Sequence, residues 1–347
     1  MILSKRIELF VSLGEFFKDF IDNSADKNFT KRLSTAIQQA KNHNNYFTEE
    51  NIINCLKNWS HSLQKGKIKS FISSYIIEKE NPKSVAIIMA GNVPLVGFHD
   101  FLCVILSGNK AIIKLSSKDI HLMDFVLNYL CSVCIDFKDY YKICQEKLSD
   151  YDAVIATGNN LSASKFKEYF NDYPNIIRKS RHSVAVLKGN ESNDQLQKLS
   201  NDIFNYFGLG CRNVSKVYLP KNYDLDLLFR SFIKWKKVIN NNSYANNYDY
   251  HRALYLLNKE VFFDNGFILL KESKKIGSPV GTLFYEYYDK YEDVEKSLSE
   301  ISEKIQCIVS NENIENFIKF GKTQSPELTD YADEVDTIDF LLKLNQD

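Results

Sequence analysis

The chain has 347 residues, 44% of them hydrophobic, so it is long enough to bury the cores of two or three packed units. Its 44 basic residues balance its 44 acidic residues, which argues against a nucleic acid or an anionic membrane as the main partner. No apolar run approaches the length that spans a bilayer, and the first residues lack the apolar core of a secretory signal. We therefore expect a soluble, cytoplasmic protein without a membrane span.

The seven cysteines favour a reducing compartment, because they are odd in number and widely spaced. Cys131 and Cys134 form the single CxxC pair, within a stretch that has the pattern of an apolar helix face. A zinc site needs further ligands at suitable spacing, and none follow. We expect no metal site and interpret this pair as core packing.

The first 80 residues have the periodicity of helices. Apolar residues recur at spacings of three and four from Ile7 to Phe20 and again from Leu33 to Ala40. A third helical tract follows Thr48, whose hydroxyl can cap its first turn. These stripes predict a helical N-terminal region whose aromatic residues pack in a core or an interface.

Strand-like runs alternate with helices from Ser84 onward. The strands are expected at 85–89, 111–115, 153–156, 184–187 and 214–219, with helices at 96–106, 120–134 and 162–170. Another helix begins at Ser192, which forms a capping box with Gln195, and we expect Gly208 to end it. Residues 240–247 have the composition of a polar loop. This alternation predicts an α/β fold with a mainly parallel sheet covered on both faces.

The segment Gly208-Leu209-Gly210-Cys211-Arg212 places a cysteine in a glycine-bracketed turn directly after that last helix. The glycines remove side-chain bulk around the thiol, and a nearby guanidinium would favour the reactive thiolate. The alternative is an inert cysteine buried at a helix end.

Polar and glycine residues follow the first three expected strands. They are Ala90-Gly91-Asn92-Val93-Pro94, Ser116-Ser117-Lys118 and Thr157-Gly158-Asn159-Asn160. Ligands of open α/β sheets gather at the carboxyl ends of strands, so these segments are candidates for ligand binding. The sequence contains neither GxGxxG nor a Walker motif, which excludes the standard dinucleotide and phosphate-loop fingerprints.

These segments, in this order, resemble the motifs of the aldehyde dehydrogenase superfamily, and more closely those of the LuxC family of acyl-CoA reductases. The similarity extends from about residue 80 to Thr329 and includes the blocks 278–282 and 325–329. The resemblance implies an aldehyde dehydrogenase-like fold of two doubly wound α/β domains with a helical N-terminal region. It places the N-terminal region and cofactor-binding domain at 1–177, the catalytic domain at 178–314, and a segment returning to the first domain at 315–347.

The resemblance also implies an activity, the reduction of a long-chain fatty acyl-CoA to the aldehyde. Cys211 would attack the thioester carbonyl, release coenzyme A and hold the acyl group until a nicotinamide cofactor reduces it. Asn92 matches the residue whose amide, with the backbone N–H of the cysteine, forms an oxyanion hole; the alternative is a turn residue before Pro94. His182 is a candidate proton donor, although a lone histidine is often structural.

Five further residues are implied to bind the cofactor: Lys114, Ser117, Thr157, Gly158 and Pro279. Ser117 stands where many NAD-preferring relatives carry a glutamate that would repel a 2′-phosphate, so we expect NADPH rather than NADH. The alternative for Lys114 and the nearby Lys118 is that both are solvated charges at a strand end.

The chain departs from hydrolytic aldehyde dehydrogenases in two places. Residues 177–183 contain no carboxylate that would activate water against an acyl-enzyme, and Lys275 stands near the position of a glutamate that grips the nicotinamide ribose. The basic residues of the first stretch could also receive phosphate groups of coenzyme A or NADPH; they are Arg178, Lys179, Arg181 and His182. The alternative is a solvated basic turn.

These departures favour a fatty acyl-CoA or acyl-protein thioester as the acyl donor. Two alternatives stay open: reduction of another activated acyl group such as an acyl phosphate, and a cysteine-dependent acyl carrier or transferase without redox activity. A homo-oligomer is compatible with the sequence.

Overall fold

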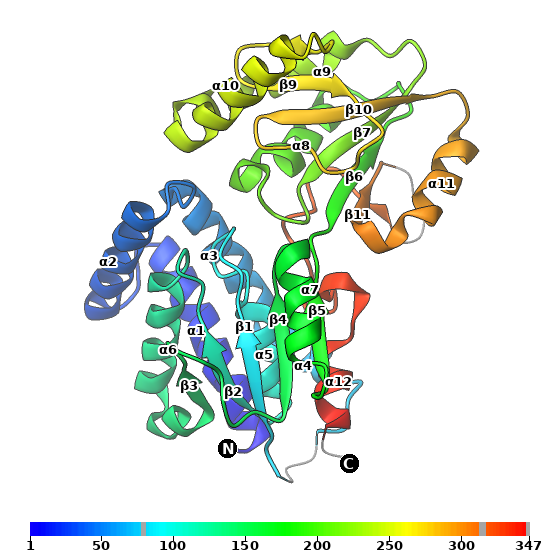
Figure 1. The fold of residues 1–347 in the computed structure, drawn as a ribbon. Helices are drawn as coiled ribbons and strands as arrows, with labels where there is room; N and C mark the ends of the chain where they lie inside the picture. The colour runs from blue at the N-terminus through cyan, green and yellow to red at the C-terminus, as the bar shows by residue number, and fades with distance from the viewer. Residues whose placement is uncertain (78–80, 312–316, 345–347) are drawn as a thin grey trace. The chain divides into compact units, whose positions relative to one another are not determined.

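The computed structural model describes residues 1–77, 81–311 and 317–344. The chain forms two compact units, the first from Met1–Lys179 with Glu327–Asp347 and the second from Ser180–Pro326. The sequence analysis placed the corresponding divisions after residues 177 and 314. Each unit contains its own sheet with helices packed on it (Figure 1).

The N-terminal region is helical, as predicted. The helices are α1 (Leu3–Ile21), α2 (Lys27–His43), α3 (Glu49–Ser62) and α4 (Lys65–Ile72). The apolar stripe of α1 is buried, and α1 packs against α3 and against helices that cover the first sheet. Thr48 caps α3, because its hydroxyl oxygen accepts the N–H of Asn51 at 3.2 Å. The sequence analysis did not predict α4.

The first unit is built on a five-stranded parallel sheet in the order β3-β2-β1-β4-β5. Its strands are β1 (Ser84–Ile88), β2 (Lys110–Lys114), β3 (Tyr141–Ile143), β4 (Ala153–Thr157) and β5 (Asn175–Arg178). Three were predicted, because β1, β2 and β4 are the buried apolar runs; β3 and β5 are short edge strands with weaker patterns. The chain winds outward from β1 in one direction and from β4 in the other, which creates a topological switch point between them.

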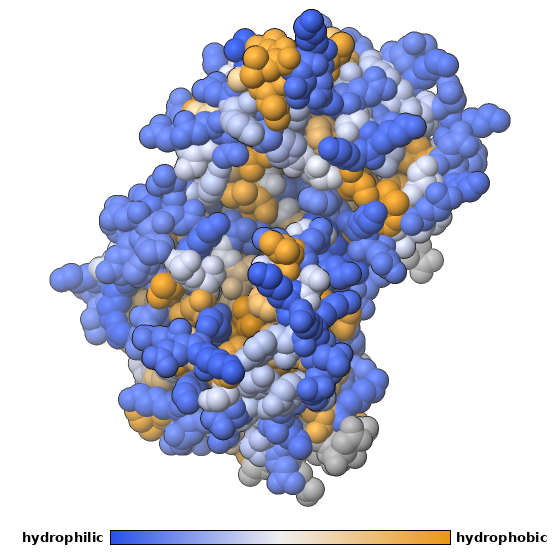
Figure 2. All heavy atoms as spheres, in the orientation of Figure 1, coloured by the Kyte–Doolittle hydropathy of each residue, from blue (hydrophilic) through white to orange (hydrophobic). Residues whose placement is uncertain are grey.

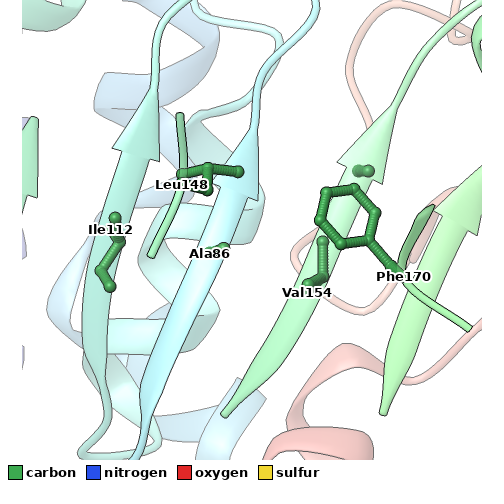
Figure 3. Close-up of a cluster of buried hydrophobic side chains, with 6 residues drawn as sticks. Ala86, Ile112, Leu148, Val154 and Phe170 are labelled. Carbon is green, nitrogen blue, oxygen red and sulfur yellow. The ribbon is translucent and has the colours of Figure 1, made fainter. Parts of the chain in front are cut away.

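Helices cover both faces of this sheet. On one face lies α5 (Phe98–Leu106), a largely apolar helix in which every residue except His99 is buried. It contacts β1 and β2, with α1 and the C-terminal α12 (Thr337–Lys343) packed against it, while α6 (His121–Val133) contacts α1 and α2. On the other face Leu148 and Phe170 form a buried cluster with residues of three neighbouring strands (Figure 3): Ala86, Ile112, Val154 and Ala156. Phe166 of α7 (Asn160–Tyr169) packs against this cluster.

The second unit is built on a seven-stranded sheet in the order β12-β11-β6-β7-β10-β9-β8, and every pairing in it is parallel except that of β8 with β9, within the residues described. Its strands are β6 (His182–Val186), β7 (Val214–Pro220), β8 (Phe263–Asp264), β9 (Leu269–Glu272), β10 (Thr282–Tyr288), β11 (Ile305–Val309) and β12 (Phe317–Ile318). The helices are α8 (Asn193–Phe204), α9 (Leu225–Phe232), α10 (Asn242–Leu257) and α11 (Tyr291–Glu300). The capping box predicted for Ser192 and Gln195 is present.

Two local expectations for the second unit are wrong. Residues 242–247 form the first turns of α10, because the Asn241 side chain accepts the N–H of Tyr244 at 3.1 Å and caps the helix. Their polar composition therefore marks a helix start and not a loop. The α-helix after Ser192 ends at Phe204, because the backbone of Asn205 leaves the helical conformation with φ of −50° and ψ of 140°, and a 3₁₀ turn over Asn205–Gly208 follows.

The predicted α/β class, with two doubly wound units and a helical N-terminal region, is confirmed. Figure 2 shows a face covered largely by hydrophilic residues, with smaller apolar areas on each unit. Within the described ranges, no helix combines the length and the apolar character needed to cross a membrane.

Candidate active site

The carboxyl edge of the first sheet brings five of the predicted residues together. Ile88, the last residue of β1, pairs with Lys114 on β2 and with Ala156 on β4. The segments that follow these strands therefore leave the sheet along one edge, at the switch point where ligands of such sheets bind. Lys114 ends β2 and Thr157 ends β4, and the segments that follow the strands carry Asn92, Ser117 and Gly158.

Asn92 is half-buried in a tight loop between β1 and α5. A Cβ atom at Gly91 would lie 2.4 Å from Ser116 Oγ, so only glycine lets this loop approach the end of β2. Leu95 has a left-handed backbone, with φ of 53°, and its N–H donates to Asp119 Oδ2 at 2.6 Å. The carbonyl of Pro94 accepts a hydrogen bond from Cys55 Sγ at 3.2 Å. Two buried side chains thus hold the loop that carries Asn92.

Asp119 is a buried carboxyl group that the sequence analysis missed. The residue is 6% exposed, and its Oδ1 atom has no hydrogen-bond partner. Burial raises the pKa of Asp119 from 3.8 to about 7, and the bond from the Leu95 N–H opposes this shift in part. The group consequently changes charge near neutral pH. The adjoining Ser-Ser-Lys segment gave no signal that the next residue would be buried.

Lys114 and Ser117 differ in exposure to solvent, and therefore in how readily a ligand could reach them. Lys114 is half-buried, and its Nζ donates to the Glu146 carbonyl at 2.6 Å. Ser117 and Lys118 are exposed. The structure therefore leaves Ser117 and Lys118 open at the sheet edge and holds Lys114 against a neighbouring loop.

Thr157 and Gly158 lead from β4 into α7. A Cβ atom at Gly158 would lie 2.8 Å from Ser162 Cβ, so the missing side chain lets the strand turn closely into the helix. Asn159 caps α7 by accepting the N–H of Ser162 at 2.8 Å. The positive end of the α7 dipole consequently lies at the same edge.

The residues of this edge fit a nicotinamide dinucleotide. The pyrophosphate of such a cofactor is anionic, and the edge combines a switch point, a helix N-terminus and the exposed ammonium group of Lys118. A carboxylate would repel an additional phosphate, and none occurs at residues 114–118.

Cys211 lies in the second unit, in the turn between α8 and β7, and is exposed. The backbone before it is left-handed at three consecutive residues: Tyr206, Phe207 and Gly208, with φ of 53°, 58° and 74°. A non-glycine residue in this conformation costs roughly 1–3 kcal/mol, so the approach to Cys211 is strained. The N–H of Asn213 donates to the Gly210 carbonyl at 3.0 Å, which closes a turn with Cys211 and Arg212 in its middle.

Side-chain hydrogen bonds fix this turn, which we call the Cys211 turn (residues 210–213). The Ser183 hydroxyl donates to the Cys211 carbonyl at 2.9 Å. Arg212 Nε donates to the Thr323 carbonyl at 2.7 Å. Neither Ser183 nor Thr323 is predictable from the sequence, because contacts between residues so distant in the chain leave no local pattern.

His182 is the first residue of β6 and is half-buried. Its ring packs on Gly277, where a Cβ atom would lie 2.3 Å from His182 Cε1. Burial lowers the pKa of His182, so the imidazole is neutral at pH 7. Successive strand residues point to opposite faces, and it is Ser183 that contacts Cys211. The structure therefore does not bring His182 onto the face of the Cys211 turn, and its role as a proton donor stays a prediction.

Pro279 lies half-buried between β9 and β10, where its carbonyl accepts the N–H of Thr282 at 3.0 Å. No described contact links it to the Cys211 turn, and its role at the cofactor stays a prediction. Among the residues that the structure describes, no group of three or more His, Cys, Asp or Glu side chains is arranged to hold a metal ion.

The expectation that Arg178 receives a phosphate group is wrong. Arg178 is buried in the first unit, where it forms an ion pair with Asp100 and donates from Nη2 to Thr337 Oγ1 at 3.0 Å. Its guanidinium group therefore serves the core of that unit. Arg181 donates from Nη1 to the Ile305 carbonyl at 3.1 Å.

Comparison with solved structures defines the class of fold. The chain is similar to aldehyde dehydrogenase 21 from Physcomitrella patens, with a TM-score of 0.69 and 10% identity over 99% of this chain and 84% of that one. It is also similar to an aldehyde dehydrogenase from Mycobacterium tuberculosis complexed with NAD+, with a TM-score of 0.63 and 9% identity over 89% of this chain and 73% of that one. The chain has the aldehyde dehydrogenase fold, which confirms that prediction.

Comparison of sequences defines the family. Residues 12–227 match the family described as acyl-CoA reductase (LuxC), and the chain belongs to this family. A curated relative, the long-chain acyl-protein thioester reductase of Aliivibrio fischeri, is 27% identical over 208 residues, or 53% of this chain. The match spans 42% of the length of that relative.

Proposed function

We propose that this protein reduces a long-chain fatty acyl thioester to the aldehyde with NADPH, through an acyl group held on Cys211. The observation that carries the proposal is the exposed Cys211 in a fixed turn, within a chain that belongs to the LuxC acyl-CoA reductase family. A relative described as an acyl-protein thioester reductase supports a thioester as the substrate.

The first step is acyl transfer. Cys211 Sγ forms a bond to the thioester carbonyl carbon, the bond from that carbon to the sulfur of coenzyme A breaks, and coenzyme A leaves with the electron pair and takes a proton. The side-chain amide of Asn92 and the backbone N–H of Cys211 donate to the oxyanion that forms in between. A donor of this kind is worth about 3–4 kcal/mol in the transition state.

The acyl group then stays on Cys211 until it is reduced. Residues 177–183 contain no carboxylate to activate water, so the chain does not favour hydrolysis to the free acid. A bound nicotinamide supplies the hydride that converts an acyl group to an aldehyde. The sulfur of Cys211 is the leaving group of this reduction and returns as thiolate, ready for a second acyl group.

Lys114, Ser117, Thr157 and Gly158 hold the cofactor in the first unit, and Pro279 contributes from the second. The first unit is thus the cofactor-binding domain, and the second is the catalytic domain. NADPH is favoured over NADH because Ser117 is exposed and uncharged and Lys118 is exposed beside it. A 2′-phosphate at this edge would meet a cation and no carboxylate.

The test is an assay of purified protein with a panel of acyl-CoA thioesters and one acylated carrier protein, each with NADPH or NADH. We expect aldehyde and the released thiol in equal amounts, faster with NADPH, and neither from Cys211→Ala. Normal turnover by Cys211→Ala would overturn the mechanism, and no aldehyde from any donor would overturn the assignment. Acylation without consumption of NADPH would indicate a transferase, and turnover of an acyl phosphate alone would indicate the other reductase.

A further inference from the structure

We propose that Asn213 is a positioning residue for acyl transfer to Cys211, a role that rests on the proposed function and deepens it. Asn213 is 2% exposed and lies two residues after Cys211, at the end of the Cys211 turn. An asparagine side chain has one carbonyl acceptor and two N–H donors, and the surroundings of Asn213 engage both kinds.

The amide of Asn213 joins the turn to the end of α8. Its Oδ1 atom accepts the N–H of Gly210 at 2.9 Å. Its Nδ2 atom donates to the carbonyls of Asp202 at 3.0 Å and Asn205 at 2.8 Å, with a longer contact of 3.4 Å to Ile203. The last carbonyls of a helix lack partners within the helix. The Asn213 side chain therefore supplies hydrogen bonds to carbonyls at the end of α8 and also holds Gly210, the residue before Cys211.

A second connection closes a ring of hydrogen bonds around the turn. The buried carboxylate of Asp202 accepts the N–H of Gly321 at 2.6 Å, the N–H of Thr323 at 3.1 Å and the Thr323 hydroxyl at 2.8 Å. The Thr323 carbonyl in turn accepts Arg212 Nε at 2.7 Å. Both neighbours of Cys211 are therefore tied to Asp202, Gly210 through Asn213 and Arg212 through Thr323.

We expect this ring of hydrogen bonds to affect acyl transfer to Cys211 more than alkylation of Cys211. Acyl transfer requires the sulfur, the carbonyl carbon and the oxyanion donors to be aligned, and a displacement of 1 Å can cost about 100-fold in rate. Alkylation by a small reagent such as iodoacetamide has no oxyanion to place. The three-residue left-handed segment before the turn stores strain that would move the turn if Asn213 no longer held Gly210 and Asn205 together.

The experiment compares wild type with Asn213→Ala and with the matched control Asn265→Ala. Asn265 lies in the loop between β8 and β9, where its Oδ1 atom accepts the N–H groups of Phe267 at 3.2 Å and Ile268 at 3.1 Å. The control thus loses an asparagine that fixes a turn in the same unit. Mass spectrometry of cysteine peptides would follow acylation by tetradecanoyl-CoA and by p-nitrophenyl butyrate, and alkylation by iodoacetamide.

We expect Asn213→Ala to slow acylation of Cys211 by about 10- to 100-fold, while alkylation of Cys211 stays within about threefold of wild type. Cys307 is 4% exposed in β11, so it stays unlabelled as long as the second unit is folded. Asn265→Ala should acylate at the wild-type rate. If Asn213→Ala does not fold, Ser183→Ala takes its place, with an expected loss of about 3- to 10-fold from the missing bond to the Cys211 carbonyl.

Three results would overturn the proposal. Asn213→Ala could acylate Cys211 at the wild-type rate, or it could lose as much in the rate of alkylation as in the rate of acylation. In the third, Cys307 becomes alkylated as the rate of acylation falls, which would show that the second unit has unfolded. Failure of the proposed function would be recognised separately. If only p-nitrophenyl butyrate acylates the wild type, the thioester assignment falls and the comparison of variants is made on that ester. If neither reagent acylates Cys211, both proposals fall.

Discussion

The carboxyl edge of the first sheet and the Cys211 turn of the second unit present their side chains in different ways. At the sheet edge, the register of three parallel strands aligns the segments that carry Asn92, Ser117 and Gly158. At the turn, strained backbone is held by hydrogen bonds from individual side chains, above all that of Asn213. An edge made by register tolerates substitution of surface residues, whereas a turn made by a few polar groups depends on each of them.

Buried carboxyl groups occur in both regions and sharpen the contrast. Asp202 accepts three hydrogen bonds, and burial raises its pKa to about 6. Asp119 accepts one from Leu95, keeps an oxygen without a partner, and has a pKa raised to about 7. Asp202, beside the Cys211 turn, thus accepts more hydrogen bonds than Asp119, which contacts the loop that carries Asn92.

The largest expected effect concerns Arg178, at the end of β5. Arg178→Met would leave the buried Asp100 side chain without its ion-pair partner, which typically costs about 3–5 kcal/mol of unfolding free energy. Urea denaturation would measure the loss, and the double variant Asp100→Leu/Arg178→Met should recover most of it. Unchanged stability together with a higher KM for NADPH or acyl-CoA would restore Arg178 as a phosphate ligand.

Asn92→Ala tests whether the sheet edge contributes to the chemistry of the cysteine. The proposed role of Asn92 as an oxyanion donor predicts that its loss lowers the rate of acylation of Cys211 about 10²- to 10³-fold, with little change in stability. Asn92→Asp keeps the shape but lacks the N–H donor, and it should lose at least as much. A rate within twofold of wild type in either variant would reduce Asn92 to a turn residue.

Asp119→Asn tests the carboxyl group beneath the loop through the pH dependence of stability. Because burial raises the pKa of Asp119 from 3.8 to about 7, the folded state binds its proton more tightly than the unfolded chain does. The resulting contribution to stability is full below about pH 4 and is lost as the pH rises through 7.

The variant keeps an acceptor for the Leu95 N–H but does not titrate. Its unfolding free energy should therefore rise relative to wild type by about 2–3 kcal/mol between pH 5 and pH 8. Denaturation curves of both proteins at pH 5 and pH 8 measure this difference. If the unfolding free energies of wild type and variant changed equally between the two pH values, the carboxyl group would not be buried as described.

Ser117→Glu has the smallest expected effect and concerns the cofactor alone. A carboxylate at this exposed position would repel a 2′-phosphate, so the preference for NADPH over NADH should fall about tenfold, equivalent to about 1.4 kcal/mol. The neutral Ser117→Gln of the same size should keep the preference, and acylation of Cys211 should be unchanged in both. An unaltered preference in Ser117→Glu would place the 2′-phosphate elsewhere.

The sequence predicts the sheet edge far better than the turn, for a physical reason. Buried parallel strands are continuous apolar runs, so β1, β2 and β4 and the polar segments after them were found from local pattern. The turn depends on contacts between residues distant in the chain, such as Ser183 with Cys211, which leave no periodic trace. The glycine-bracketed segment 208–212 pointed to Cys211, and the resemblance to LuxC implied its role as the nucleophile, but neither gave any indication of which residues hold the turn.

In the proposed reaction the acyl group is carried on Cys211, and one measurement tests this directly. The protein is incubated with an acyl-CoA in the absence of nicotinamide, quenched, digested and analysed by mass spectrometry. We predict the acyl mass on the peptide that contains Cys211, and its replacement by an equal amount of aldehyde once NADPH is added. Aldehyde formation with no acyl group on Cys211, or with the acyl group on another residue, would contradict the account.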